Sequence, residues 1–229
     1  MSFLTLAELR RDTPQARAYA RLLLDSSVED SAHRLVWLLF GDNPDAERDF
    51  LFREAEPGRF LVVSQRQPAG EEAIWSLKSR PYQPAPVKGR RYGFSLRANP
   101  TVSLSQPGRA RSLVRDVLLH AKKQAGRPLT PEEREAAALA WLTARGERMG
   151  VTFDPALCQA KRYDLLKVSR KKEKDKAKGS AHPAEFTVVD FEGVLTVEDP
   201  AALETTLRAG IGKGRAYGLG LMLLRPLGD

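Results

Sequence analysis

The order of the expected strands and helices is the sequence feature that most constrains how this chain can fold. Residues 3–9 alternate as a strand does, and Pro14 suits the first turn of a helix. The next expected elements are a helix over residues 30–39, strands over 49–54 and 59–65 joined by a turn at Glu56-Pro57-Gly58, a short helix over 72–77 and a strand over 90–98. This β-α-β-β-α-β order is that of a ferredoxin-like domain.

The second half of the sequence repeats this order in outline, with a less clear opening strand. Thr130 is followed by a proline and two glutamates, which predicts a helix start, and that helix is expected to reach Arg148. Further elements are strands over residues 152–154, 158–169, 186–198 and 217–224, and a helix over 200–208 capped by Asp199. We therefore predict an α+β fold of two tandem ferredoxin-like (βαββαβ, RRM-like) domains with antiparallel sheets, over residues 1–103 and 131–229, with a linker and basic helix over 104–130.

The charge of the chain indicates what kind of partner it binds. Its 37 Lys and Arg against 29 Asp and Glu give a formal net charge of +8, which favours a polyanion, either nucleic acid or an anionic membrane surface. No apolar run approaches the roughly 20 residues needed to cross a bilayer, and the first residues, with Glu8 among them, do not resemble a secretory signal. A single cysteine, Cys158, gives no disulfide framework. We expect a cytoplasmic protein with no membrane partner, because no cationic amphipathic helix stands out in the sequence.

Two segments are candidates for binding phosphate. Residues 210–220 contain five glycines with Lys213 and Arg215 among them, and a loop of this kind can turn its backbone N–H groups toward an anion. It is not a P-loop, because the apolar run that follows predicts a strand. Residues 167–178 contain seven cations in twelve residues. Each segment has a simpler interpretation, a flexible turn for the first and a solvated loop for the second.

The sequence offers few groups for catalysis. It has no Cys/His cluster at zinc spacing, no HExxH, no GxSxG elbow and no evident carboxylate pair, so we predict neither a metal nor a cofactor. RNA carries its own nucleophile, the 2′-hydroxyl, and a protein that cleaves it needs only a proton-transfer group and cations. Histidine suits proton transfer. The candidates are His33, His120 and His182, and for His33 a structural role at a helix start is the simpler interpretation.

Five segments stand in one order along nearly the whole chain. They are HRLVWLLF at residues 33–40, DAERDFLFR at 45–53 with LVVSQ at 61–65, YGFSLRANP at 92–100, FEGVLTV at 191–197 and GIGKGRAYGLGL at 210–221. Together they resemble the CasE family, the RNA-processing endoribonucleases of type I-E CRISPR systems. The string F-x-L-R-A-N-P at residues 94–100 is the most characteristic of them.

This resemblance implies a metal-independent endoribonuclease that cleaves CRISPR repeat RNA at the base of its stem-loop. The products would be a 5′-hydroxyl and a 2′,3′-cyclic phosphate or 3′-phosphate. The protein would then stay on the crRNA with the other type I-E Cascade subunits. The catalytic histidine of the family falls on His33. The RNA-binding residues that we predict are Arg34, Arg97, Asn99, Arg170, Lys171, Lys172, Lys174, Gly212, Lys213, Gly214 and Arg215.

One position departs from the family pattern. The family commonly has a tyrosine three residues before its histidine, and this chain has Asp30 there. Tyr19, one helix earlier, is the candidate that the sequence offers in its place. The second catalytic partner therefore stays open, and so does an alternative function, a non-catalytic subunit that binds the RNA hairpin through the same surfaces.

Overall fold

The chain forms two compact units. The computed structural model describes residues 2–24, 28–41, 47–105, 113–168 and 184–228. Unit 1 consists of Met1–Gln83, Leu165–Phe186 and Ala216–Gly218, and unit 2 consists of Pro84–Asp164, Thr187–Arg215 and Leu219–Asp229. The helices within the described ranges are all too short or too polar to pass through a lipid bilayer.

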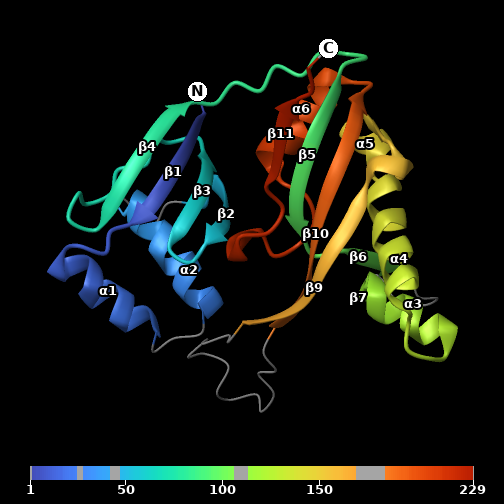
Figure 1. The fold of residues 1–229 in the computed structure, drawn as a ribbon, viewed down its shortest axis with the longest axis horizontal. Coiled ribbons are helices and arrows are strands. Elements are labelled where there is room, and N and C mark those ends of the chain that lie inside the picture. Colours follow the sequence, from blue (N-terminus) through green and yellow to red (C-terminus); the bar gives the residue numbers. More distant parts are fainter. Residues whose placement is uncertain (1, 25–27, 42–46, 106–112, 169–183, 229) are drawn as a thin grey trace. The chain divides into compact units, whose positions relative to one another are not determined.

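Unit 1 is built on a four-stranded antiparallel sheet with the strand order β2-β3-β1-β4 (Figure 1). Its first and third strands therefore lie in the centre, which is the order of a ferredoxin-like sheet. Its elements are β1 (Phe3–Leu9), α1 (Pro14–Leu24), α2 (Val28–Trp37), a 3₁₀ turn (Leu38–Phe40), β2 (Phe50–Glu56), β3 (Arg59–Ser64) and β4 (Trp75–Pro81).

Helix α2 packs on this sheet through one apolar stripe. Ala32, Leu35 and Val36 are buried and belong to the same hydrophobic cluster as Phe52 and Phe60 of the sheet. A spacing of three and four residues places such side chains on one face of a helix. The residues between them therefore lie at the edge of the stripe or outside it, which is why His33 is half-buried and Arg34 is exposed.

Two elements of the first hundred residues differ from the sequence prediction. The helix expected over residues 72–77 is absent, because residues 72–74 form a turn and the buried Trp75 begins β4. The strand expected over 90–98 is present as β5 (Arg91–Ala98), but it pairs with β10 and β11 of the second sheet. The units consequently divide after residue 83, where the sequence suggested residue 103.

Unit 2 has the ferredoxin-like strand order as well. Its sheet runs β11-β5-β10-β8, with β9 also paired to β10, and β5 is the opening strand that the sequence left unclear. The fold class predicted from the sequence is thus confirmed. The elements are β8 (Val151–Phe153), β9 (Gln159–Val168), β10 (Ala184–Val197) and β11 (Met222–Pro226), with helices α4 (Pro131–Thr143), α5 (Gly146–Met149) and α6 (Pro200–Ala209).

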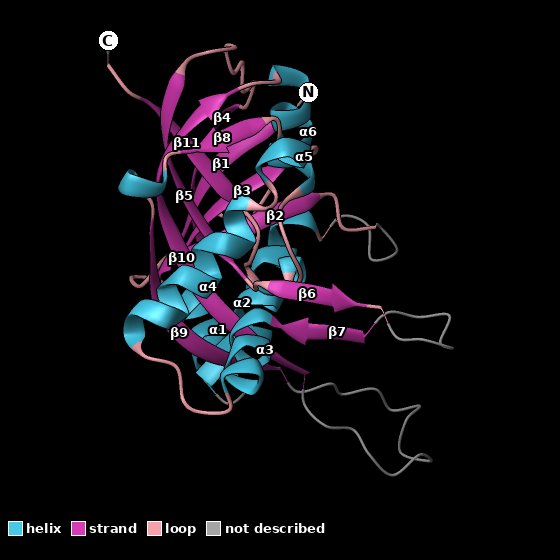
Figure 2. Cartoon of the chain, turned by 90° about the vertical axis from the view of Figure 1, so that its right-hand side faces the viewer, coloured by secondary structure: helices cyan, strands magenta, loops and turns pink. Residues whose placement is uncertain are grey.

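The expected linker, residues 104–130, is part of unit 2. Strands β6 (Thr101–Leu104) and β7 (Leu113–Asp116) form a separate two-stranded sheet (Figure 2), and β7 leads into α3 (Val117–Ala125). The Asp116 carboxylate caps α3 by accepting a hydrogen bond from the Leu119 backbone N–H at 2.9 Å.

Candidate functional site

The glycine-rich segment, residues 210–220, is a loop closed at its base. The Ile211 N–H donates to the Gly220 carbonyl oxygen at 2.9 Å, and the Gly220 N–H donates to the Arg97 carbonyl oxygen at 2.7 Å. A Cβ atom on Gly220 would lie 2.6 Å from the Ile211 carbonyl oxygen, so the closure requires glycine at this position. The last strand starts only at Met222, five residues later than the sequence suggested.

Asn99 holds the first part of this loop from inside unit 2. It forms an isolated antiparallel bridge with Lys213, and its side-chain amide donates to the Thr187 carbonyl oxygen at 2.8 Å. Asn99 is only 3% exposed. The glycines on either side of Lys213, Gly212 and Gly214, have φ of 79° and 78°, in the left-handed region that side chains disfavour. The loop thus presents Lys213 while its backbone is fixed by Asn99.

Eight of the predicted RNA-binding residues divide into three groups by their surroundings. Lys213 and Arg215 are exposed on the loop, and Arg215 donates to the Ala209 carbonyl oxygen at 2.5 Å. Arg97 makes a two-pronged ion pair with Asp190, at 2.7 and 2.9 Å, and with Asn99 it is engaged inside unit 2. Four cations of residues 167–178, the basic segment, lie outside the described residues: Arg170, Lys171, Lys172 and Lys174.

The imidazole of His33 is fixed by a backbone carbonyl. Its Nδ1 lies 2.7 Å from the carbonyl oxygen of Ala216, 183 residues later in the chain and within the same unit. A carbonyl oxygen only accepts, so Nδ1 must carry the hydrogen and donate it. In the neutral imidazole the lone pair then lies on Nε2. Within the described residues Nε2 makes no hydrogen bond, so it is the nitrogen available for chemistry.

The segment Ala216–Gly218 is held in place by its own packing in unit 1. Gly218 has a φ of 78°, and a Cβ atom there would lie 3.1 Å from the ring of the buried Phe52. The Tyr217 ring contacts two neighbouring rings, with centroids 5.9 Å from His33 and 5.5 Å from Phe186. These contacts bring His33 and part of the glycine-rich loop together. The sequence identified both but carried no sign of their contact.

Other residues singled out from the sequence lie elsewhere. Tyr19 packs against the core of unit 1 and has no ring contact with His33. The tyrosine whose ring lies beside His33 is Tyr217, which the sequence pattern did not single out. The side chain of Asp30 and all of His182 lie outside what the structure describes. His120 lies on α3, and its Nδ1 is buried without a hydrogen-bond partner among the described residues.

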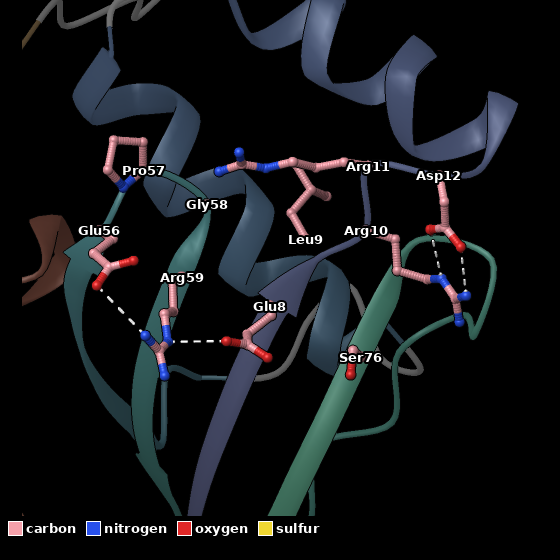
Figure 3. Close-up of a pocket in the computed structure, with 10 residues that line it drawn as sticks. All are labelled: Glu8, Leu9, Arg10, Arg11, Asp12, Glu56, Pro57, Gly58, Arg59 and Ser76. Carbon is pink, nitrogen blue, oxygen red and sulfur yellow. Dashed lines mark hydrogen bonds and ion pairs between the residues drawn. The ribbon is translucent and has the colours of Figure 1, made fainter.

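A cavity of about 470 Å³ opens in unit 1 beside the turn between β2 and β3 (Figure 3). Its charged groups largely pair with one another: Arg59 with Glu8 at 2.9 Å, and Arg10 with Asp12 at 2.8 Å. Arg10 lowers the pKa of the Asp12 carboxyl to about 2 by hydrogen bonding to it. The paired charges make the cavity a poor binding site for an anion. Across the described parts of the chain, no three His, Cys, Asp or Glu side chains gather to hold a metal ion.

Comparisons with known proteins agree on one family. A family model described as CRISPR associated protein matches residues 2–226. The Cascade subunit CasE of Escherichia coli is 30% identical over 217 residues, covering 93% of this chain and 96% of the relative. The CRISPR-associated endoribonuclease Cse3 of Thermus thermophilus is 30% identical over 228 residues, covering 95% and 93%.

Solved structures agree as well. One structure of the CRISPR endoribonuclease Cse3 bound to a 19-nucleotide RNA is similar with a TM-score of 0.69 at 26% identity, covering 98% of both chains. A Thermus thermophilus Cse3 bound to an RNA that represents a pre-cleavage complex gives a TM-score of 0.67 at 26% identity, covering 98% of this chain and 99% of the other. The chain therefore belongs to the CRISPR-associated CasE family, as its sequence motifs indicated.

Proposed function

We propose that this protein is a metal-independent endoribonuclease that cleaves the repeat stem-loops of precursor CRISPR RNA. The observation that carries this proposal is the hydrogen bond from His33 Nδ1 to the Ala216 carbonyl oxygen, which leaves Nε2 as a proton acceptor. Family membership adds that Cse3, a relative over nearly the whole chain, is named an endoribonuclease and has been solved with RNA. The protein acts in the cytoplasm.

The reaction needs no group beyond the RNA and the side chains of this chain. The 2′-oxygen attacks the adjacent phosphorus, the P–O5′ bond breaks, and the products are a 2′,3′-cyclic phosphate (or 3′-phosphate after hydrolysis) and a 5′-hydroxyl. His33 Nε2 takes the proton of the 2′-hydroxyl as this oxygen attacks. Cations near the phosphate stabilise the charge that develops on its oxygens. Arg215 directly precedes Ala216 in the chain and is exposed, which suits it to this role.

We assign RNA binding to cations of α2, of the glycine-rich loop and of the basic segment, and to the glycines of that loop. Arg34, Lys213 and Arg215 contact the RNA backbone together with the basic segment: Arg170, Lys171, Lys172 and Lys174. A-form RNA hides its base edges in a deep, narrow groove, so contacts to phosphates and shape suit a stem. Gly212 and Gly214 let the backbone approach the RNA. Arg97 and Asn99 contribute through the loop base that they hold, because both side chains are engaged within the protein.

The processed RNA stays bound after cleavage. CasE of Escherichia coli is named a subunit of Cascade, and a protein that keeps its product delivers the crRNA to such a complex with the other subunits. Single-turnover kinetics are then expected, with the burst of product equal to the concentration of the enzyme.

The test is cleavage of a cognate repeat RNA in EDTA under single-turnover conditions. Exchanging His33→Ala should lower the rate by about 10²- to 10⁴-fold, the usual contribution of a proton-transfer group, with little change in hairpin affinity. The matched control is His120→Ala, which removes the histidine on α3 and should cleave at the wild-type rate. RNA with a 2′-deoxy sugar before the scissile phosphate should remain intact, and its cleavage would falsify the attack by the 2′-hydroxyl.

The second candidate function is a subunit that binds the hairpin without cutting it. It is favoured by Asp30, which stands where the family resemblance implies a tyrosine. The same cleavage assay, read on a gel, separates the two candidates. If the protein is a non-catalytic subunit, the wild type would bind the RNA and shift its mobility but leave it uncut.

A further inference from the structure

We infer that the Tyr217 hydroxyl is the second proton-transfer group of this site, the general acid that protonates the 5′-oxygen as it leaves. This inference rests on the proposed function and goes beyond it by naming a catalytic residue in the glycine-rich loop. Three observations support it: the fixed tautomer of His33, the position of the Tyr217 ring, and the state of its hydroxyl.

The reaction transfers two protons, and His33 can transfer only one of them while the 2′-oxygen attacks the phosphorus. The 2′-hydroxyl loses a proton as it attacks, and the 5′-oxygen must gain one as the P–O5′ bond breaks. The Nδ1 hydrogen of His33 is committed to the Ala216 carbonyl at 2.7 Å. The remaining nitrogen, Nε2, cannot accept one proton and donate another in the same step. A second group beside the imidazole is therefore required.

Tyr217 is the group that the structure places there. Its ring centroid lies 5.9 Å from that of His33, with the two planes tilted by 44°. Phe186 lies 5.5 Å away from the same ring, and Gly218, with its φ of 78°, fixes the backbone next to it. These contacts within unit 1 hold the ring beside the imidazole.

The Tyr217 hydroxyl is available for a substrate. Tyr217 is half-buried, yet among the described residues its hydroxyl makes no hydrogen bond, whereas the hydroxyls of Tyr92 and Tyr163 do. A half-buried tyrosine hydroxyl usually has a partner. A phosphate or sugar oxygen of bound RNA would supply it.

The other described side chains near His33 fit this role less well. Tyr19 is packed against the core of unit 1. Trp37, whose ring lies 6.3 Å from the imidazole, has an indole N–H that does not exchange protons as an acid. Arg34 carries a guanidinium, a group that binds phosphate through its N–H donors and does not serve as a general acid.

The proton balance closes with these two residues. The 2′-O–H proton passes to His33 Nε2, the 2′-O–P bond forms and the P–O5′ bond breaks, while Tyr217 gives its hydroxyl proton to the 5′-oxygen. The site then holds an imidazolium and a phenolate. Transfer of the proton from His33 to Tyr217, directly or through water, restores both groups, so no further reactant is consumed.

The test compares Tyr217→Phe with the wild type on two RNAs under single-turnover conditions. This exchange removes only the hydroxyl and keeps the ring contacts. One RNA is unmodified, and the other has sulfur in place of the bridging 5′-oxygen. A thiolate leaves without being protonated because thiols are far more acidic than alcohols. We expect the variant to be about 10²- to 10⁴-fold slower on the oxygen RNA and equal to the wild type on the sulfur RNA.

Tyr163→Phe is the matched control, because it removes a hydroxyl that hydrogen-bonds to the Ala160 carbonyl oxygen in unit 2. It should cleave both RNAs at wild-type rates. Equal slowing of Tyr217→Phe on both RNAs would assign Tyr217 a shaping role only and overturn the inference, as would a wild-type rate on the oxygen RNA. A wild-type protein that cleaves neither RNA would refute the proposed function itself, which distinguishes the two failures.

Discussion

At the scale of single residues, Gly218 lies two residues after Ala216, whose carbonyl oxygen accepts the hydrogen bond from His33. An alanine here would be strained by the φ of 78° and would press its Cβ to 3.1 Å from the ring of Phe52. We predict that Gly218→Ala lowers the free energy of unfolding by about 1–3 kcal/mol and slows cleavage, because the Ala216 carbonyl moves. Denaturant unfolding and single-turnover cleavage measure the two effects.

A second glycine provides a control that separates the effect of backbone strain from the effect of moving the Ala216 carbonyl. Gly126 ends α3 with a φ of 67°, and a Cβ there would meet nothing within 4 Å. Gly126→Ala should therefore cost about 1 kcal/mol from the backbone alone and leave the cleavage rate unchanged. A Gly218→Ala variant that cleaves like Gly126→Ala would show that the loop does not position the imidazole.

At the scale of elements, α4 is held at its start by a reciprocal cap. The Thr130 hydroxyl accepts from the Glu133 N–H at 3.2 Å, and the Glu133 carboxylate accepts from the Thr130 N–H at 2.9 Å. We predict that Thr130→Ala lowers the free energy of unfolding by about 1 kcal/mol. Thr205→Ala, which removes a hydroxyl bonded back to Ala201 within α6, is the control and should change it by less. Equal losses would contradict the cap.

The same cap makes the start of α4 sensitive to acid. Arg127, which hydrogen-bonds to Glu133 at 2.5 and 2.8 Å, lowers the pKa of the Glu133 carboxyl to about 2. A depressed pKa stabilises the folded state above the ordinary pKa of glutamate, and this contribution is lost as the pH falls from about 4.3 toward 2. Carboxyl NMR titration should show the pKa of Glu133 rising in Arg127→Ala, and an unmoved value would refute the pairing.

The elements that sequence could predict were those with local signals. Caps at Thr130 and Asp199 and the turn at Gly58 appear where expected, because short-range hydrogen bonds and backbone dihedrals determine them. The pairing of β5 was not predictable, because an alternating pattern shows which face of a strand is buried and not which sheet it joins. The contact of His33 with Ala216 has no local signal at all.

At the scale of the whole molecule, the formal net charge of +8 predicts RNA binding that depends strongly on salt. Exchanging Arg170, Lys171 and Lys172 together for alanine should weaken binding and reduce the slope of log affinity against log salt by about 3, roughly one for each lost phosphate contact. Filter binding of the repeat stem-loop over a salt series gives the slope.

The control for this prediction has the same change in net charge at scattered sites. Lys78, Lys88 and Lys123 are exposed on β4, on the segment before β5 and on α3. Their joint exchange for alanine should leave the slope closer to that of the wild type. Equal slopes for the two triple variants would mean that net charge alone, and no particular segment, attracts the RNA.

The hydrogen bond between His33 and Ala216 cannot form until late in the synthesis of the chain. A ribosome must add 183 residues after His33 before the acceptor exists, which takes about 10–40 s at about 5–20 residues per second. Throughout that interval a growing chain has its histidine but nothing to fix the tautomer. Under the role proposed for His33, an RNA that met the nascent protein would remain uncut until residue 216 had been made and had folded against the histidine.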